Sequence, residues 1–294
     1  MATLKDKIEN ALNEARMLVL GGQVLIGSSY RAAFNPGFQR LPRTVQLAHL
    51  AALVLMLAGL GALLLPCPFH RIVEHGENTN RLHRLITRML EIGLFPFAVG
   101  LGVNAHIAMT VVKPGAGLTF GILLLMIPLA IWYAYPLAVR KDMKGDTEEK
   151  PVSLTEKIKE ALIEARIILP GAQALLAFQV ASVLTEGFDQ LSAVSKSMHL
   201  AGILAVSVAI ILLIAPAACH RISFRGEDSE EFYRLSGRFT LSAIFCLGLG
   251  ISGDLFVVVD KITKSGNTAA VISAAMLTFL YAIWFGYSYW KKSD

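Results

Sequence analysis

The sequence contains the same pattern twice, and this repetition constrains the fold more than any other feature of the chain. A shift of 150 positions aligns the first half of the sequence with the second half. The shift becomes 152 at residues 130–132 and 282–284, which both read Ala-Ile-Trp, as a two-residue insertion in a loop would produce. Each copy is much longer than the roughly 20 to 50 residues of a solenoid unit. We therefore interpret the copies as two domains of one architecture.

The boundaries of the copies follow from this alignment. We place the first copy at residues 1–140 and the second at residues 154–294. Residues 141–153 between them are rich in lysine, aspartate and glutamate and contain Gly145 and Pro151. This composition is typical of a solvated linker. The identical pairs include Glu14 and Glu164, Gly21 and Gly171, Gln23 and Gln173, His70 and His220, and Arg71 and Arg221.

Each copy contains four apolar segments of membrane-spanning length. The chain is 54% hydrophobic and only 17% charged, whereas soluble domains contain about 25% charged residues. A transmembrane helix needs about 20 apolar residues, and backbone groups cannot stay unpaired in hydrocarbon. We predict an all-α polytopic membrane helix bundle with eight transmembrane helices in two parallel four-helix repeats. The expected spans are residues 17–34, 46–66, 88–109 and 118–138, and residues 167–185, 198–217, 238–259 and 269–288.

The distribution of basic residues predicts the orientation of these spans. Segments on one side of the expected membrane carry 20 Lys and Arg residues, and segments on the other side carry 7. The positive-inside rule then places both termini in the cytoplasm. Because each copy has an even number of spans, the two copies have the same orientation. This distribution also accounts for the net charge of +5, so no nucleic-acid partner is expected.

Both copies begin with an amphipathic segment, at residues 4–16 and 154–166. Leu4, Ile8 and Leu12 share one face of the first segment, and charged residues such as Glu14 and Glu164 occupy the other side. This pattern is typical of a helix that lies in the headgroup region of a bilayer. In the second copy, a proline at position 170 is expected to separate this helix from the following span.

The second copy resembles a known family through three segments. These are residues 164–173, which contain Pro170, residues 214–222, which contain His220 and Arg221, and residues 225–227. They resemble an uncharacterised family of bacterial four-span membrane proteins, classified as a domain of unknown function. The first copy departs from the pattern at Leu20, which replaces Pro170, and at residues 67–68. The resemblance implies a bacterial inner-membrane protein with a helical bundle, and it implies no mechanism.

A histidine–arginine pair ends the second span of both copies, as His70-Arg71 and His220-Arg221. A histidine at this boundary relays protons or senses pH in some proteins, because its unperturbed pKa lies near 6.5. The simpler interpretation is that both residues cap a helix C-terminus and meet lipid headgroups. We favour the simpler interpretation and keep both histidines as candidates for a proton path.

Pairs of arginines four residues apart begin the third helix of each copy. This spacing places both guanidinium groups of a pair on one helix face, where they could bind a phosphate or an anionic headgroup. The alternative is that the pairs anchor the helix at the inner membrane interface. The candidate residues for anionic lipid or phosphate are Arg71, Arg84, Arg88, Arg221, Arg234 and Arg238.

Two other polar residues inside or beside the spans occur in both copies. Gln23 and Gln173 lie in the first span, next to a glycine that allows close helix approach, so they either join helices or line a polar cavity. His49 and His199 begin the second span at the other side of the membrane. They are either interfacial residues or an entry point for protons, and the pattern does not distinguish these roles.

Two acidic residues lie within the third spans. Glu91 belongs to the first copy, and Asp254 belongs to the second copy, where the first copy has Asn104. Carboxylates inside a membrane are costly unless they are paired or protonated, so both are candidates for a cation or proton path. The structural alternative is that Glu91 pairs with Arg88 and that Asp254 stays hydrated near the membrane surface.

The leading functional hypothesis is passive or proton-coupled movement of a small ion or solute along the interface between the copies. The alternative is a non-transporting scaffold that binds anionic lipid or partner proteins through its interfacial helices and Arg/His hairpins. A continuous polar cavity would favour transport, and a dry interior would favour the scaffold. Enzyme, metal-site and cofactor motifs are absent from the sequence, so no enzyme activity or cofactor is expected. The expected partner is the lipid bilayer, and self-association stays open.

Overall fold

The computed structural model describes residues 4–113, 115–138, 151–225 and 227–292. Within these ranges every regular element is helical, which confirms the all-α prediction. The predicted linker, residues 141–153, lies outside the described residues except for its last three positions.

The first repeat consists of four long helical segments with short helices between them. Its elements are α1 (Leu4–Ala32), α2 (Pro36–Gln39), α3 (Arg43–Leu64), α4 (Pro66–Ile72), α5 (Asn80–Val112), α6 (Gly117–Leu129), the π-helical turn η1 (Ala130–Ala134) and α7 (Tyr135–Ala138). Thr79 caps α5 by accepting a hydrogen bond from the Leu82 amide.

The second repeat has the same order of elements, except that one continuous helix, α10, replaces α3 and α4. They are α8 (Leu154–Val183), α9 (Glu186–Asp189), α10 (Ala193–Ile222), α11 (Glu230–Thr263), α12 (Gly266–Tyr281), the π-helical turn η2 (Ala282–Gly286) and α13 (Tyr287–Lys292). The two π-helical turns coincide with the repeated Ala-Ile-Trp sequence, so this irregularity belongs to both repeats.

Seven helical segments in the described part of the chain are long and apolar enough to cross a membrane. They are Arg43–Ile72, Asn80–Val112, Gly117–Ala138, Leu154–Val183, Ala193–Ile222, Glu230–Thr263 and Gly266–Lys292. The protein is therefore a multi-pass membrane protein. Helix α1 is not among the seven, although its counterpart α8 is. The buried side of α1 includes Gln23, Ser29 and Tyr30, and these polar residues lower its hydropathy.

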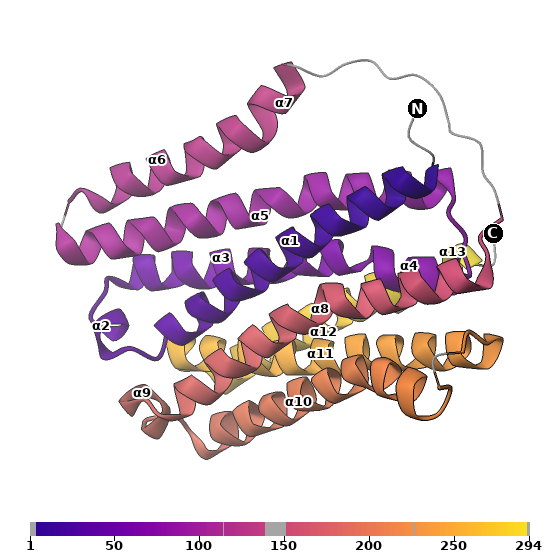
Figure 1. Ribbon diagram of the computed structural model, residues 1–294. Coiled ribbons are helices and arrows are strands. Elements are labelled where there is room, and N and C mark those ends of the chain that lie inside the picture. The colour runs from indigo at the N-terminus through magenta and orange to yellow at the C-terminus, as the bar shows by residue number, and fades with distance from the viewer. Residues whose placement is uncertain (1–3, 114, 139–150, 226, 293–294) are drawn as a thin grey trace.

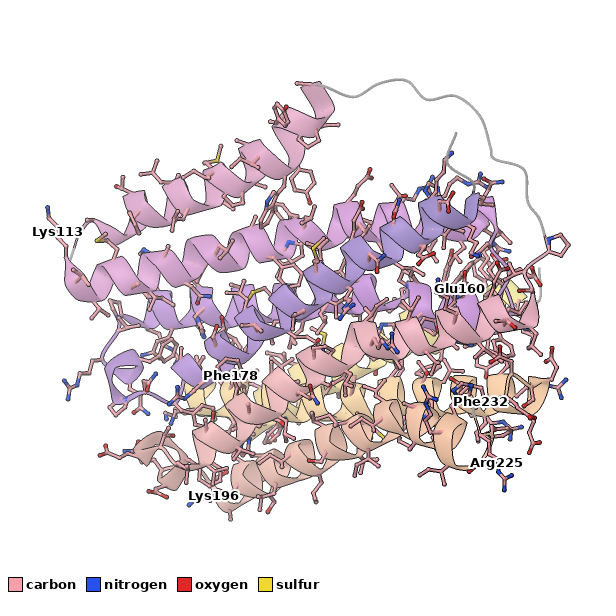
Figure 2. The ribbon with its side chains drawn as sticks, viewed as in Figure 1. Lys113, Glu160, Phe178, Lys196, Arg225 and Phe232 are labelled. Carbon is pink, nitrogen blue, oxygen red and sulfur yellow. The ribbon has the colours of Figure 1, made fainter. Side chains whose placement is uncertain are left out.

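The long helices lie roughly side by side, with the first repeat above the second in the view of Figure 1. One end of the bundle, which we call the hairpin end, carries residues 70–79 and 220–225. The other end, which we call the loop end, carries α2 and α9. Helices α1 and α8 both run from the hairpin end to the loop end and pack against each other along the junction of the repeats. Figure 2 labels Glu160 at the hairpin end of α8 and Phe178 nearer its loop end.

The amphipathic segments do not form separate interfacial helices. Residues 4–16 and 154–166 continue without a break into the rest of α1 and α8, and α8 passes through Pro170. The prediction of a break at Pro170 is therefore wrong. Leu4, Ile8 and Leu12 are buried in the core of the bundle, so their apolar face covers protein.

Candidate functional site

Two clusters of buried polar side chains lie where the repeats meet. The first, called the Asp254 cluster, consists of Tyr30, Gln179, His199 and Asp254. The second, called the Glu164 cluster, consists of His70, Arg71, Asn78, Glu160 and Glu164. All nine side chains are buried. Polar groups inside a membrane protein are costly unless they are paired, so these clusters are the principal functional candidates.

The Asp254 cluster joins α1 of the first repeat to three helices of the second. The Tyr30 hydroxyl lies 2.6 Å from Nδ1 of His199. The Gln179 side-chain amide donates to Oδ2 of Asp254 at 2.7 Å. Nδ1 of His199 also lies 3.6 Å from Oδ1 of Asp254. One imidazole therefore faces a phenol and a carboxylate at the same time.

The hydrogen bonds of His199 define which nitrogen carries a proton. Nε2 lies 3.0 Å from the backbone carbonyl of Gln179, and a carbonyl oxygen only accepts hydrogen bonds, so Nε2 carries a hydrogen. In the neutral imidazole Nδ1 is then the acceptor for the Tyr30 hydroxyl. When Nδ1 is also protonated, its N–H faces Asp254 as a cation. The cluster can therefore hold an additional proton on the imidazole or on the carboxyl group.

One oxygen of Asp254 has no hydrogen-bond partner in the described structure. Oδ1 is buried and makes no hydrogen bond there. Gly202 of α10 faces this oxygen, because a side chain at Gly202 would begin 3.2 Å from it. Gly202 also lines a groove of about 440 Å³ between α10, α11 and α12, whose walls are mostly apolar. The groove thus approaches Asp254 from the outside of the bundle.

The space on the other side of Asp254 is small. A cavity of about 10 Å³ lies between the repeats and is lined by Asp254, Tyr30 and six aliphatic side chains. A volume of this size holds about one water molecule. The space beside the carboxyl group therefore accommodates little more than one water molecule.

The first repeat contains a related arrangement without an acid. Nε2 of His49 lies 2.9 Å from the Ser29 carbonyl, as His199 does from the Gln179 carbonyl. Asn104 donates to the Ser29 hydroxyl at 3.0 Å. The histidine-to-carbonyl contact thus belongs to both repeats, and the acid belongs to the second repeat alone.

The Glu164 cluster connects α4 of the first repeat with α8 of the second at the hairpin end. Oε1 of Glu164 lies 2.6 Å from Nδ1 of His70, and Oε2 accepts from Nε of Arg71 at 2.6 Å. Asn78 donates to Glu160 at 2.8 Å on the same side of α8. A guanidinium group and an imidazole therefore compensate the buried Glu164 carboxylate, and they fix the hairpin of one repeat to the other.

A more exposed ion pair continues this attachment. Glu77 lies 2.5 Å from the Lys157 ammonium and accepts from the Val152 amide at 3.0 Å. Partial burial raises the pKa of the Glu77 carboxyl, but the hydrogen bonds from Lys157 and Val152 outweigh it and leave the pKa below its ordinary value. Glu77 is therefore held in its charged form.

A basic cavity of about 550 Å³ lies next to the Glu164 cluster. Its cationic lining residues are Arg71, Lys157, Arg234, Arg238 and Lys292. Nη2 of Arg71 is buried and has no hydrogen-bond partner within the described structure, because Glu164 engages Nε. Arg71 also lies over the ring of Tyr233, with its Cζ atom 5.2 Å from the ring centre. The Arg71 side chain therefore lines the cavity, and its buried Nη2 atom makes no hydrogen bond within the described residues.

The sequence profile of a family of unknown function, DUF6328, matches residues 3–136 and, a second time, residues 147–288. The chain belongs to this family. It contains two DUF6328 domains in tandem, which confirms both the duplication and the predicted resemblance. Comparisons with curated proteins and with solved structures gave no match. The DUF6328 assignment thus establishes kinship and leaves the activity to be argued from the two clusters.

The structure separates several residues that the sequence grouped into one path. Asp254 is buried between the two DUF6328 domains, whereas the Glu91 side chain is exposed on α5. Gln23 is enclosed between α1 and α8, but Gln173 is exposed on the opposite side of α8. Asn104 bonds to Ser29 within the first domain. Only Asp254 among these five belongs to a cluster that joins the domains.

The Arg/His pairs also differ between the two domains. His70 and Arg71 are buried in the Glu164 cluster, so the interpretation of this pair as headgroup contacts is wrong for the first domain. Arg221 is exposed, and His220 lies 3.6 Å from Asp228 of its own domain. The four remaining candidate arginines, Arg84, Arg88, Arg234 and Arg238, are all exposed on the third helices.

Sequence reasoning missed Tyr30, Gln179 and Glu160 and placed Glu164 on a solvated face. None of the first three is repeated at its counterpart, where the sequence has Val180, Ser29 and Asn10. One signal was available, because Gln179 is an amide inside an apolar segment. Tyr30 gave no signal, since a tyrosine near a span end is ordinarily an interfacial residue.

Proposed function

We propose that the chain crosses a bacterial inner membrane eight times, with both termini and both hairpins on the cytoplasmic side. The excess of Lys and Arg at the hairpin end supports this orientation. The equivalence of α1 and α8, which run in the same direction along the junction, supports eight spans. In this arrangement the Asp254 cluster lies in the half of the membrane that faces away from the cytoplasm.

The leading function that we propose is proton-coupled movement of a small solute or ion, with Asp254 and His199 as the proton-binding pair. The observation that carries this proposal is the buried carboxyl group whose Oδ1 atom accepts no hydrogen bond within the described residues and lies 3.6 Å from Nδ1 of His199. A buried carboxylate without a permanent cation beside it requires a proton on itself or on its neighbour. Gain and loss of that proton would change the hydrogen bonds of Tyr30, which links the site to the first repeat.

The surroundings of Asp254 suggest how a solute would reach it. Gly202 separates the Asp254 carboxyl group from the apolar groove of about 440 Å³. The groove favours a solute that is small and largely apolar. The cavity between the repeats measures about 10 Å³ and is lined mostly by aliphatic side chains, so the described residues enclose no continuous polar cavity there and this conformation, taken alone, favours the scaffold. Transport therefore requires that this conformation is an occluded state. Alternating access would then require the repeats to move relative to each other.

The experiment that tests this function is a proton-flux assay in liposomes. Purified protein is reconstituted with an internal pH-sensitive dye, and proton and sodium gradients are imposed in separate runs. We expect the wild type to dissipate a pH gradient faster than protein-free liposomes, and we expect Asp254→Asn to lose at least nine-tenths of that rate.

The matched control is Glu91→Gln, which neutralises an acid that is exposed on α5. This variant should retain the wild-type flux. A wild-type flux equal to that of empty liposomes, with correctly folded protein, would contradict the proposal. A flux that Asp254→Asn leaves unchanged would contradict the role of the Asp254 cluster.

We infer a second candidate function from the basic cavity, namely retention of an anionic lipid through its phosphate group. Three cations of the cavity are exposed, namely Arg234, Arg238 and Lys292. None of them forms an ion pair with an acidic residue of the described cavity lining. The unpartnered Nη2 atom of Arg71 is a suitable donor for a phosphate oxygen, because guanidinium and phosphate groups form charge-assisted hydrogen bonds. This arrangement favours the scaffold hypothesis at the hairpin end.

Native mass spectrometry tests this second function. The double substitution Arg234→Ala with Arg238→Ala should reduce retention of phosphatidylglycerol at least fivefold. The repeat-equivalent control, Arg84→Ala with Arg88→Ala, should leave it unchanged. Competition by glycerol 3-phosphate would indicate that the cavity recognises a phosphate group without its acyl chains. Equal retention in both double variants would reject the site.

A further inference from the structure

The two repeats contact each other through faces that are not equivalent. The first repeat uses a surface of α1, α3 and α4, which we call face A. The second repeat uses a surface of α8, α11, α12, η2 and α13, together with His199 of α10, which we call face B. For example, Trp284 of η2 donates to the Gly61 carbonyl of α3 at 2.8 Å. A two-fold interface would use one face on both partners, so this contact is heterologous. It leaves face B of the first repeat and face A of the second unused.

The unused face B of the first repeat displays the counterparts of buried contact residues. Glu14 is exposed, whereas Glu164 is buried against α4. Gly21 has nothing within 4 Å of the position where a side chain would begin. Its counterpart Gly171 is covered by Gln23. The same helix surface is therefore filled in the second repeat and empty in the first.

The unused face A of the second repeat shows the complementary pattern. Gln173 is exposed on α8, whereas Gln23 is enclosed at the junction. Arg221 is exposed and makes no ion pair within the described residues, whereas Arg71 is bound to Glu164. Leu184, at the loop end of the same face, is 86% exposed.

The fourth span of the first repeat also lacks a partner. Figure 1 shows α6 and α7 diverging from α5 toward the hairpin end. In the second repeat, η2 and α13 pack against α3 and α4, and Trp284 is completely buried there. The counterpart of Trp284 in the first repeat, Trp132, is half-buried, and its neighbours Ile131 and Tyr135 are 59% and 67% exposed. The divergence of α6 and α7 is what the absence of an opposing face A would produce.

We propose that the two unused faces bind each other between chains, so that a second copy of this protein is the partner. Face B of one copy would receive face A of the next. Glu14 would then meet Arg221, as Glu164 meets Arg71 within the chain, and Gln173 would cover Gly21, as Gln23 covers Gly171. The opposite charges of Glu14 and Arg221 favour this pairing. The contact would also remove the Gln173 amide from lipid, where an unpaired polar group is costly.

Some residues at the two unused faces differ from their counterparts in the internal contact, and these differences affect how closely the two chains would pack. Within the chain, the Phe178 ring occupies the space above Gly27. At the unused faces the corresponding residues are Ser28 and Ala177. Ser28 is smaller than Phe178 and Ala177 is larger than Gly27, so the two changes offset each other in part. In contrast, Ile211 occupies the position of Gly61. Within the chain, Leu280 packs so closely on Gly61 that a side chain there would begin 2.6 Å from the Leu280 side chain. The contact between chains would therefore be looser than the internal one, and we expect reversible association.

Disulfide cross-linking between differently labelled chains tests this proposal. All variants lack the native Cys67, Cys219 and Cys246, and one chain carries Gly21→Cys while a separate, co-expressed chain carries Gln173→Cys. Within the chain, Cβ of Gln23 comes within 3.0 Å of the position where a side chain of Gly171 would begin. The proposed contact reproduces this geometry, which is close enough for a disulfide after a small adjustment. We expect a covalent dimer in membranes that contain both chains.

The controls distinguish this contact from other kinds of association. A single chain with Gln23→Cys and Gly171→Cys should form an internal cross-link and stay monomeric in size. Membranes that contain only the Gly21→Cys chain, or only the Gln173→Cys chain, should give at least tenfold less dimer than the mixture. A two-fold contact would cross-link one of these single variants with itself and would overturn the heterologous arrangement. Absence of dimer in the mixture, with the internal cross-link formed, would overturn the proposal.

A charge exchange provides an independent readout that does not depend on cysteine chemistry. Glu14→Lys should lower the oligomeric fraction at least tenfold, as counted by single-molecule photobleaching in liposomes. Adding Arg221→Glu in the same chain should restore it to within about threefold, because each contact would again join opposite charges. The charge reversal Glu231→Lys, on the exposed start of α11, should have no effect. Failure of the double variant to recover would contradict the Glu14–Arg221 pairing.

Discussion

Arg71 of the first repeat donates from Nε to Oε2 of Glu164 in the second repeat at 2.6 Å, and both side chains are buried. Their counterparts, Arg221 and Glu14, have the same identities and lie on the surface of the bundle. One sequence pattern thus occupies two environments within one chain. Most substitutions at the junction therefore have a control at the equivalent position of the other repeat.

Glu164→Gln should destabilise the protein strongly. The substitution removes a buried negative charge and leaves the Arg71 guanidinium without its counter-ion. Breaking one partner of a buried ion pair costs about 3–5 kcal/mol. The expected result is a lowered unfolding midpoint in detergent, measured by circular dichroism or by the accessibility of the three half-buried cysteines.

The control for this substitution is Glu14→Gln, measured at concentrations where the chain is monomeric. Glu14 is exposed, and surface substitutions change stability by less than about 0.5 kcal/mol. Equal unfolding midpoints for the two variants would show that the Glu164 cluster does not hold the repeats together.

Gly187→Ala should also destabilise the junction, for a steric reason. A Cβ atom at Gly187 would lie 2.0 Å from the Phe34 carbonyl oxygen, which belongs to the backbone and cannot rotate away. Overpacking of this kind costs about 1–3 kcal/mol. The equivalent substitution Gly37→Ala meets nothing within 4 Å and should be neutral. Thermal unfolding of the two variants compares them directly, and a neutral Gly187→Ala would mean that α9 does not pack closely on Phe34.

The duplication and the helical class could be predicted from the sequence, because both depend on patterns that extend over many residues. Repeated glycines and apolar segments report directly on helix packing in a membrane. The pairing of Glu164 with His70 and Arg71 could not be predicted in the same way. Identical residues in the two copies suggest identical roles, and a heterologous contact gives them different roles.

The Asp254 cluster shows a second limit of sequence reasoning. Asp254 itself was identified because an acid in an apolar segment is rare. Its partners Tyr30 and Gln179 come from other helices, 224 and 75 positions away in the sequence respectively by their residue numbers. Neither residue is repeated in the other copy, so the identity between the copies does not mark them. Only the packing of α1 against the second repeat brings Tyr30 to His199.

Tyr30→Phe should weaken the junction near Asp254. The substitution removes the hydroxyl that lies 2.6 Å from Nδ1 of His199 and leaves a buried acceptor without a partner. Such a loss costs about 1–3 kcal/mol. The matched control is Tyr133→Phe, which removes a hydroxyl that donates to the Glu91 carbonyl at an exposed position. Hydrogen exchange of residues 24–32 should accelerate in Tyr30→Phe and stay unchanged in the control. Unchanged exchange in both variants would show that the Tyr30 hydroxyl does not stabilise the Asp254 cluster.

The attachment of the first hairpin should depend on pH through Glu77. Hydrogen bonds from Lys157 and from the Val152 amide place the pKa of Glu77 below its ordinary value of 4.5. A lowered pKa in the folded state means that this carboxylate stabilises the attachment above the ordinary pKa, and that the contribution is lost as pH falls through the folded value. We therefore expect the protection factor of residues 73–79, the intrinsic exchange rate divided by the observed rate at the same pH, to be constant near neutral pH and to fall below about pH 4.5.

Two variants separate this effect from general acid unfolding. Glu77→Gln should lower the protection factors of the hairpin already at neutral pH, with a weaker further decrease on acidification, because the titrating group is gone. Glu227→Gln, the repeat equivalent, alters an exposed carboxylate and should retain the wild-type pH profile of residues 73–79. The wild-type profile persisting in Glu77→Gln would assign the acid sensitivity to another group. The buried Glu164 carboxylate, which holds the same hairpin through His70 and Arg71, would then be the next residue to substitute.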